Sequence, residues 1–168
     1  MTVPTQPVRI RPVRSSDHRA VMAVIDDWWG GRHMADMLPR LFFEHFTDTS
    51  FAAERDDELA GFLVGFRSQS RPAEAYIHFV GIHPGERGRG LGRQLYERFF
   101  EAVGARGCAE VHAVTSPVNR GSIAFHQRMG FDIEPGEARA DGVPVAAGYD
   151  GDGQDRVRFV RRLDPATG

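Results

Sequence analysis

The chain has 168 residues, of which 41% are hydrophobic and 26% are charged, and its formal net charge is -2. This length and balance predict one globular domain with a core of its own, and they exclude a dedicated nucleic-acid binder, which should be basic. The sequence has no apolar run of membrane length, no signal-peptide pattern and a single cysteine, which together predict a cytoplasmic protein with no membrane association.

The first half of the chain predicts three strands and two helices. After a loose lead-in over residues 1–7, the pattern gives a strand at 8–11, a helix from the caps Ser15–Asp17 to Gly30, a second helix at 38–46, and a hairpin of strands 50–54 and 59–66. The caps are expected because Ser and Asp side chains bond the first helical N–H groups. Asp56 and Asp57 are expected to form the turn of the hairpin.

The second half predicts four more strands and two helices. The pattern gives a strand at 76–82, a helix from Leu91 to about Val103, a strand at 110–115, a helix capped by Asn119 and stopped by Gly130, a short strand at 131–134, a loop at 135–155 and a strand at 156–163. A single domain over 8–163 with a polar tail at 164–168 follows from this order.

The stretch from 76 to 93 organises the chain. An apolar strand breaks at His83-Pro84, a loop rich in Gly and Arg follows, and a helix then begins at Leu91. The first turn of a helix offers unpaired N–H groups, glycines let a phosphate approach the backbone, and arginines add charge-assisted bonds. The stretch therefore predicts a site for a phosphate-bearing ligand, against the alternative of a plain Gly/Arg surface loop.

The glycine spacing is neither that of a Walker loop nor that of a dinucleotide fingerprint. Arg87-Gly88-Arg89-Gly90-Leu91-Gly92 instead resembles the acyl-CoA signature Arg/Gln-x-x-Gly-x-Gly/Ala of the GNAT-type N-acetyltransferases. The segment Asn119 to Phe131 resembles the second signature of that family, Asn-x-x-Ser/Ala-x-x-Phe-Tyr-x-x-x-Gly-Phe.

The resemblance implies a GNAT-like α/β (α+β) fold. It would have a mixed, mostly antiparallel twisted sheet of about seven strands, four helices and two splayed central parallel strands. The resemblance also implies acetyl-CoA as the cofactor, with its pantetheine arm paired to the strand that ends at Ile82. The residues expected to contact acetyl-CoA are Val80, Gly81, Ile82, Arg87, Gly88, Arg89, Gly90, Leu91, Gly92, Arg93, Asn119, Ser122 and His126.

Two histidines are candidate catalytic groups. The family often has Tyr where this chain has His126, and that Tyr protonates the departing thiolate. Imidazole can also donate a proton, but a plain helix-surface histidine is the alternative. His78 could take a proton from an ammonium substrate, while the alternative is a satisfied, partly buried histidine. If the strand has no bulge, Tyr76, His78, Val80 and Ile82 share one face.

The resemblance implies an acceptor site shaped by the first two helices and the last loop. Trp28, Trp29 and Asp27, with Tyr76 and His78, could hold a cationic substrate, although Trp28 could equally lie in the core. The run from Phe46 to Pro84 also resembles diaminobutyrate acetyltransferases, with a different, Gly-Phe ending.

The resemblance implies an acetyl-CoA-dependent N-acetyltransferase in which a primary amine of a small molecule attacks the thioester directly, with the Val80 N–H stabilising the oxyanion. The alternatives are a protein-lysine or N-terminal acetyltransferase and a catalytically weak acyl-CoA sensor. No metal site is expected, because the seven histidines show no paired ligand spacing. The sequence leaves open whether the chain forms a homodimer.

Overall fold

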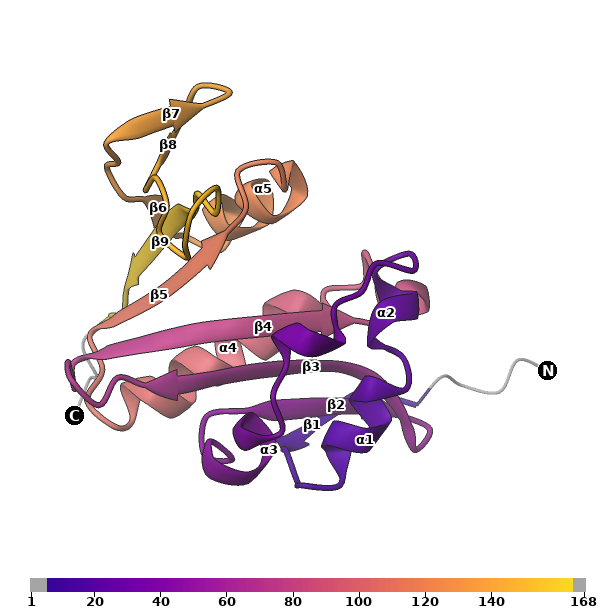
Figure 1. The fold of residues 1–168 in the computed structure, drawn as a ribbon. Coiled ribbons are helices and arrows are strands. Elements are labelled where there is room, and N and C mark those ends of the chain that lie inside the picture. The colour runs from indigo at the N-terminus through magenta and orange to yellow at the C-terminus, as the bar shows by residue number, and fades with distance from the viewer. Residues whose placement is uncertain (1–5, 165–168) are drawn as a thin grey trace. The chain divides into compact units, whose positions relative to one another are not determined.

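The structure is a computed structural model that describes residues 6–164. In chain order its elements are β1 (Arg9–Pro12), α1 (Asp17–Met22), α2 (Ile25–Trp28), the 3-10 helix η1 (Ala35–Met37), α3 (Leu41–His45), β2 (Phe51–Arg55), β3 (Glu58–Arg67), β4 (Glu74–Ile82), the 3-10 helix η2 (Pro84–Glu86), α4 (Leu91–Gly104), β5 (Glu110–Thr115), α5 (Arg120–Arg128), β6 (Asp132–Ile133), β7 (Ala138–Ala140), β8 (Val143–Val145) and β9 (Val157–Arg162) (Figure 1). Among these residues no helix has the length and apolar character needed to cross a bilayer.

Seven strands are hydrogen-bonded in the order β1-β2-β3-β4-β5-β9-β6. The pairs β1–β2, β2–β3, β5–β9 and β6–β9 are antiparallel, while β4 and β5 are parallel over three residue pairs, from Glu74–Glu110 to Tyr76–His112. The predicted fold class, a mixed α/β fold with a mostly antiparallel seven-stranded sheet, is confirmed. The chain divides into two compact units, one made of residues up to Phe66 with Ile77–Val103 and the other of Arg67–Tyr76 with the remainder.

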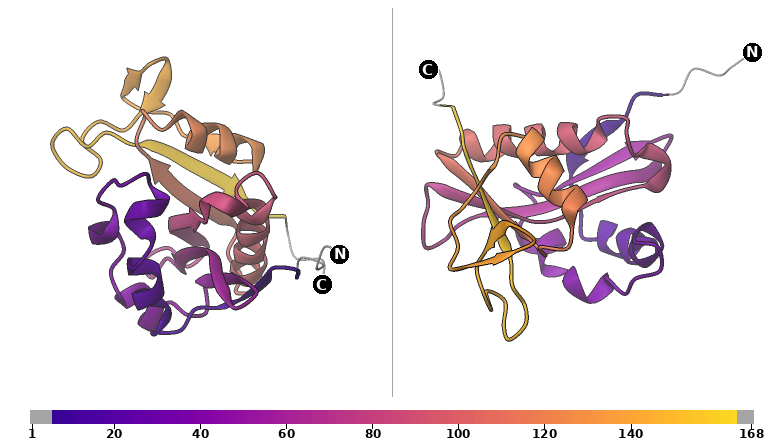
Figure 2. Two further views of the ribbon diagram at one scale, coloured as in Figure 1. Left: turned by 90° about the vertical axis from the view of Figure 1, so that its right-hand side faces the viewer. Right: turned by 90° about the horizontal axis from the view of Figure 1, so that it is seen from above.

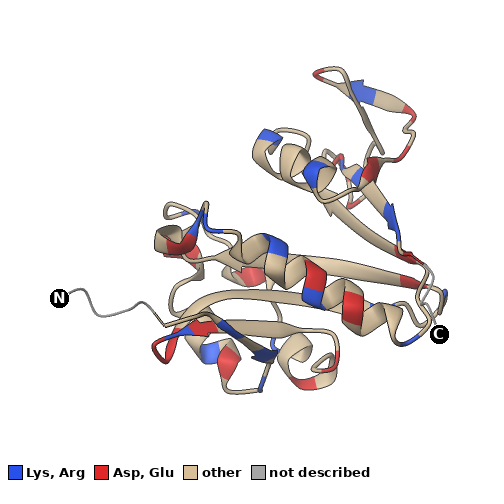
Figure 3. Ribbon diagram, turned by 180° about the vertical axis from the view of Figure 1, so that it is seen from behind, with Lys and Arg blue, Asp and Glu red and all other residues tan. Residues whose placement is uncertain are grey.

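The first unit has helices on both faces of strands β1–β4. Figure 2 shows α4 on one face and α1, α2 and α3 on the other. The side chains of Phe43, Phe62 and Val64 are fully buried between α1–α3 and the sheet. On the other side α4 buries Leu95 and Phe99, while its outer side carries both signs of charge, as with Arg93 and Glu97 (Figure 3).

The hairpin between β2 and β3 turns at Asp56-Asp57, as predicted. Both residues have positive φ, 52° and 62°, the conformation that a two-residue type I′ turn requires. Asp tolerates this region better than most side chains because its short carboxylate can bond locally. The turn fixes the register that places Arg55 opposite Glu58.

The prediction of a single first helix up to Gly30 is wrong, because the structure has two short helices there, α1 and α2. The helix breaks at Val24, whose φ of -124° lies outside the helical region. Ser16 occupies the N-cap position of α1 but makes no side-chain bond there. The carboxylate of Asp17 instead accepts the Arg14 N–H at 2.7 Å and the Arg11 guanidinium.

The second unit contains a hairpin that the sequence pattern did not predict. Strands β7 and β8 pair antiparallel within residues 135–155, which were expected to be a loop. The turn is Asp141-Gly142, with φ of 49° and 81°, a known hairpin signal. The strands have three residues each, too short for a clear alternation of apolar and polar residues. The core of this unit includes Val111, Phe131 and Phe159.

Candidate functional site

The loop between β4 and α4 begins with the short helix η2. Its cap is His83, whose Nδ1 accepts the Gly85 N–H at 2.9 Å, while the His83 N–H donates to the Ala60 carbonyl of β3 at 2.9 Å. The His83 ring also meets the edge of Trp28 at 5.5 Å between centroids. These contacts fix the end of β4 and the direction in which the loop leaves it.

Arg87, the first residue of the predicted acyl-CoA signature, ties the loop to two other elements. Its guanidinium donates to the Trp28 carbonyl at the end of α2 and, at 3.4 Å, to the Ile82 carbonyl at the end of β4. The arginine therefore shapes the loop through backbone carbonyls. The sequence pattern predicted a cofactor contact for Arg87 and did not indicate this bracing role.

Gly88 and Gly90 have positive φ, 76° and 83°, and a Cβ built on either would meet no atom within 4 Å. Glycine is needed there for the backbone conformation, since other residues are strained at such φ, and not because space is short. The open space lies beside the first turn of α4, which starts at Leu91 and whose first intrahelical bond runs from Gln94 N–H to Gly90 O. N–H groups before Gln94 therefore have no acceptor within the helix.

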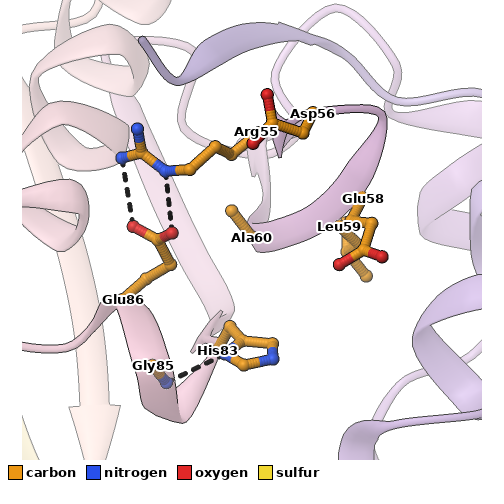
Figure 4. Close-up of a pocket in the computed structure, with 8 residues that line it drawn as sticks. All are labelled: Arg55, Asp56, Glu58, Leu59, Ala60, His83, Gly85 and Glu86. Carbon is orange, nitrogen blue, oxygen red and sulfur yellow. Dashed lines mark hydrogen bonds and ion pairs between the residues drawn. The ribbon is translucent and has the colours of Figure 1, made fainter. Parts of the chain in front are cut away.

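Charged side chains surround this loop. Glu86 is buried and paired in two places with Arg55, at 2.8 and 3.1 Å, and this bonding lowers the pKa of Glu86. Arg89 lies 3.6 Å from Glu86 and Arg93 lies 3.7 Å from Glu97, and both arginines are about half exposed. A hollow of about 170 Å³ lies behind the loop, with the Arg55–Glu86 pair and His83 among its walls (Figure 4).

The end of β4 carries Val80, Gly81 and Ile82, the strand residues expected to pair with the cofactor. A Cβ on Gly81 would lie 2.4 Å from the Phe62 ring and 3.0 Å from Trp29. Ile82 instead lies on the side of α4, because a Cβ on Gly61 would contact both Ile82 and Leu91. Any residue other than glycine at position 81 would push these rings away, so glycine lets them pack closely against the strand.

Burial alternates along β4. Ala75, Ile77, Phe79 and Gly81 are buried, while Tyr76, His78, Val80 and Ile82 are partly exposed, which agrees with the predicted shared face of these four residues. His78 stacks on Phe42, and its neighbour Phe79 meets Phe62 and Trp29. Both residues therefore contact the aromatic side chains that pack against this strand.

His78 is held by two contacts. Its Nε2 lies 2.7 Å from the Met37 carbonyl, and its ring is parallel to Phe42 at 4.6 Å between centroids. A carbonyl only accepts, so Nε2 carries the hydrogen and Nδ1 keeps the lone pair in the neutral ring. The geometry can therefore present Nδ1 as a base in a fixed orientation.

The other predicted acceptor residues of this unit have different environments. Trp28 is 5% exposed and stacks on Phe62, so it is a core residue, the alternative that the sequence left open. Trp29 is half-buried against Phe79, and Asp27 is exposed. The neighbouring Asp26 has a structural role: it accepts the N–H groups of Met34 and Ala35, and the Met34 bond is the main cause of its lowered pKa.

The second unit contains Asn119, Ser122 and His126. Asn119 caps α5 as predicted, accepting the Ser122 N–H at 3.1 Å. His126 is 6% exposed, its Nδ1–H donates to the Ser122 carbonyl at 2.7 Å, and its ring stacks on Phe159 at 4.4 Å. Burial lowers the pKa of His126, although the bond to Ser122 opposes this shift. The imidazole is thus neutral near pH 7, which weighs against the predicted acid role; that role stays a prediction.

Tyr76, the remaining predicted substrate residue, pairs with His112 across the parallel strands β4 and β5. Burial raises the pKa of Tyr76 well above its ordinary value, so its hydroxyl is protonated at neutral pH and can donate a hydrogen bond. The candidate residues thus divide between the two units, with His78, Trp29 and the 80–93 segment in the first, and Tyr76, Asn119, Ser122 and His126 in the second.

Comparison with known proteins agrees with this geometry. The model of the Acetyltransferase (GNAT) family matches residues 18–131. A crystal structure of a GNAT-family protein from Desulfovibrio desulfuricans superposes with a TM-score of 0.76 at 21% identity, covering 94% of this chain and 100% of that one. At this identity the likeness shows the fold.

Two groups of curated relatives are matched over part of their length. The chain is 30% identical over 86 residues to an L-2,4-diaminobutyric acid acetyltransferase of Shouchella clausii. This match covers 51% of this chain and 48% of that protein. It is 34% identical over 82 residues to an L-methionine sulfoximine/L-methionine sulfone acetyltransferase of Pseudomonas aeruginosa. This match covers 45% of this chain and 48% of that protein. The chain thus spans about half the length of these relatives. The family match extends over more than half of the chain, and the protein therefore belongs to the Acetyltransferase (GNAT) family.

Proposed function

We propose that the protein transfers the acetyl group of acetyl-CoA to a primary amine of a small molecule. The observation that carries the proposal is the loop from Arg87 to Gly92, where two glycines at positive φ open onto unfilled space at the first turn of α4. A helix N-terminus attracts anions through its unpaired N–H groups and its dipole. The loop therefore fits the pyrophosphate of a coenzyme A ester.

Acetyl-CoA would supply an acetyl thioester, and this chain supplies the groups that bind it. Backbone N–H groups from Gly88 to Arg93 would hold the pyrophosphate, and the half-exposed guanidinium groups of Arg89 and Arg93 would add positive charge. The Arg55–Glu86 pair and the carbonyl contacts of Arg87 keep the loop in its open shape. Val80, Gly81 and Ile82 would pair with the pantetheine arm, and Asn119 and Ser122 belong to the second signature.

An amine is mostly protonated at neutral pH, because a lysine-like group titrates near ~10.4, and it must lose a proton before it attacks a carbonyl. We infer that His78 Nδ1 accepts this proton, because Nε2 already donates its hydrogen to the Met37 carbonyl. The Val80 N–H would stabilise the oxyanion that forms when the amine adds to the carbonyl. No covalent enzyme intermediate is required by this scheme.

A small amine is preferred as acceptor over a protein lysine. Both groups of curated relatives are named for small amino-acid substrates, diaminobutyric acid and methionine sulfoximine or sulfone. The net charge of -2 gives no broad field that would select a large cationic partner. Near the expected acceptor position, the half-buried Trp29 and the exposed Asp27 could attract the ammonium group.

The proposal is tested by incubating the protein with acetyl-CoA and a panel of amines, with thiol release as the rate measurement and mass spectrometry of the products. Acetylation of at least one small primary amine is expected. Acetyl-CoA binding without turnover on any amine would favour the acyl-CoA sensor, and preference for lysine peptides would favour a protein acetyltransferase.

A further inference from the structure

Two glutamates and a histidine meet on the parallel strands β4 and β5 of the second unit. Glu74 is paired in register with Glu110, and His112 follows Glu110 by two residues. Residues two apart on a strand point to the same face, so the three side chains gather on one side of the strand pair. None of the three belongs to the residues assigned to acetyl transfer.

The three potential ligand atoms are already close together. His112 Nε2 lies 3.0 Å from Glu110 Oε2 and 3.6 Å from Glu74 Oε2, and all three atoms lie within 4.8 Å of one another. In a tetrahedral zinc site with bonds of about 2.0–2.2 Å, neighbouring ligand atoms are roughly 3.3–3.5 Å apart. Small side-chain adjustments would therefore place an ion between them.

The side chains also have the burial and rigidity that a site requires. Their exposed fractions are 17% for His112, 28% for Glu74 and 32% for Glu110, so each is partly shielded yet reachable from solvent. The backbone pairing of β4 with β5 holds all three Cα positions. Two carboxylates directly opposite each other on adjacent strands repel, and a divalent cation would remove this repulsion.

We propose that Glu74, Glu110 and His112 form a binding site for Zn²⁺, with water in the fourth position. One imidazole with two carboxylates suits a first-row transition ion, whereas Mg²⁺ and Ca²⁺ prefer ligand sets made of oxygen alone. Bound zinc would fasten the start of β4 to β5, which are paired over only three residues. Residue spacing could not indicate this site, because Glu74 lies far from Glu110 and His112 along the chain.

Without zinc the same residues form an ion cluster, which is the rival interpretation. His112 can bridge both carboxylates, Arg71 lies 3.7 Å from Glu74, and Arg162 is paired in register with Glu110. Zinc would compete with these cations for the carboxylates. Binding therefore has to be measured with the full chain.

The test is thermal unfolding of the full chain, stripped with chelator and then titrated with ZnCl₂, together with the visible spectrum on Co²⁺ addition. At zinc about 100-fold above Kd, the midpoint should rise by about 5–10 °C. Co²⁺ should give the d–d absorption of a nitrogen- and oxygen-ligated site. Glu110→Gln and His112→Ala should each lose both responses.

His33→Ala is the matched control. His33 also lies between two carboxylates, Asp26 and Asp36, but it contacts them through different ring nitrogens and so does not converge on one point. This variant should keep the full zinc response. A wild-type protein with no midpoint rise and no cobalt spectrum would overturn the proposal, even if the variants failed to fold. An equal zinc response in His112→Ala would also overturn it.

Discussion

Gly90 gives the sharpest test of where the cofactor binds. Its φ of 83° strains any other residue, at a cost of about 1–2 kcal/mol, while the space around a new Cβ is open. Gly107, which follows the other end of α4, has a φ of 89° and the same open surroundings. Gly90→Ala and Gly107→Ala should therefore lower the unfolding midpoint alike, by about 2–8 °C.

The glutamate variants at the same two positions separate strain from binding. A carboxylate about 6 Å from one phosphate charge raises the energy by about 3 kcal/mol at an effective dielectric constant of 20, and salt reduces this value. Gly90→Glu should consequently bind acetyl-CoA about 10- to 100-fold more weakly than wild type. Gly107→Glu has the same added charge and strain away from the signature loop, so its affinity should stay unchanged.

The assay is isothermal titration calorimetry with acetyl-CoA at constant ionic strength, after thermal melts show that each variant is folded at the temperature of the titration. If Gly90→Glu binds as tightly as Gly107→Glu, the pyrophosphate does not lie at this loop. The assignment that rests on Arg87 to Gly92 would then be refuted.

The other predictions concern His78, His126 and Arg11. His78→Ala should lower kcat and flatten its rise with pH, because Nδ1 is the proposed base, whereas His45→Ala, an exposed histidine of α3, should not. His126→Phe should keep kcat near wild type, because the buried imidazole is neutral and its pKa is lowered. Arg11→Met should lower the unfolding free energy at pH 7 by about 2–3 kcal/mol, since it leaves the Asp17 carboxylate without its paired cation and Glu54 with Arg9 alone.

The pH dependence of stability checks two of these variants. A lowered pKa of His126 in the fold means that stability is full above the ordinary histidine value of about 6.5 and falls as pH drops below it; His126→Phe should flatten this part of the profile. Burial raises the pKa of Asp17, but its bonds to Arg11 and to the Arg14 N–H outweigh this effect, so the pKa is lowered. Bonding to Arg11 also lowers the pKa of Glu54. Stability is therefore present above about pH 4 and lost below it, and Arg11→Met should weaken this dependence.

Contrary outcomes are equally clear. A pH–rate profile of His78→Ala that matches wild type would remove His78 as the base. A tenfold or larger loss of kcat in His126→Phe, with acetyl-CoA affinity intact, would restore His126 as the acid. Equal unfolding free energies of Arg11→Met and wild type, measured by urea denaturation, would show that the Arg11 pairs contribute little.

Local patterns predicted the parts of the fold that depend on neighbouring residues. The apolar spacing from Leu91 to Val103 gave α4, Asn119 gave the start of α5, and Asp56-Asp57 gave the β2–β3 turn, because each signal lies within a few residues of its effect. The predicted side-chain cap of α1 by Ser16 is not formed. The Asp17 carboxylate instead accepts the Arg14 N–H and the Arg11 guanidinium.

The site was predictable as a motif but not as a set of contacts. The Met37 carbonyl that orients His78 is 41 residues away in sequence, and the Arg55–Glu86 pair that supports the loop joins residues 31 apart. Such partners leave no mark in hydrophobic spacing. The aromatic partners of His78 and Phe79 likewise come from other elements: Trp29 follows α2, Phe42 lies in α3 and Phe62 lies in β3.

The central claim is acetyl transfer to a small primary amine, and the most direct measurement is kcat/KM for a panel of small amines, including 2,4-diaminobutyric acid, against lysine-bearing peptides. Thiol release should depend on both acetyl-CoA and the amine, and mass spectrometry should find one added acetyl group on the small amine. The account predicts clearly higher kcat/KM for at least one small amine than for any peptide. Higher kcat/KM for a peptide, or no amine-dependent thiol release from a protein that binds acetyl-CoA, would contradict it.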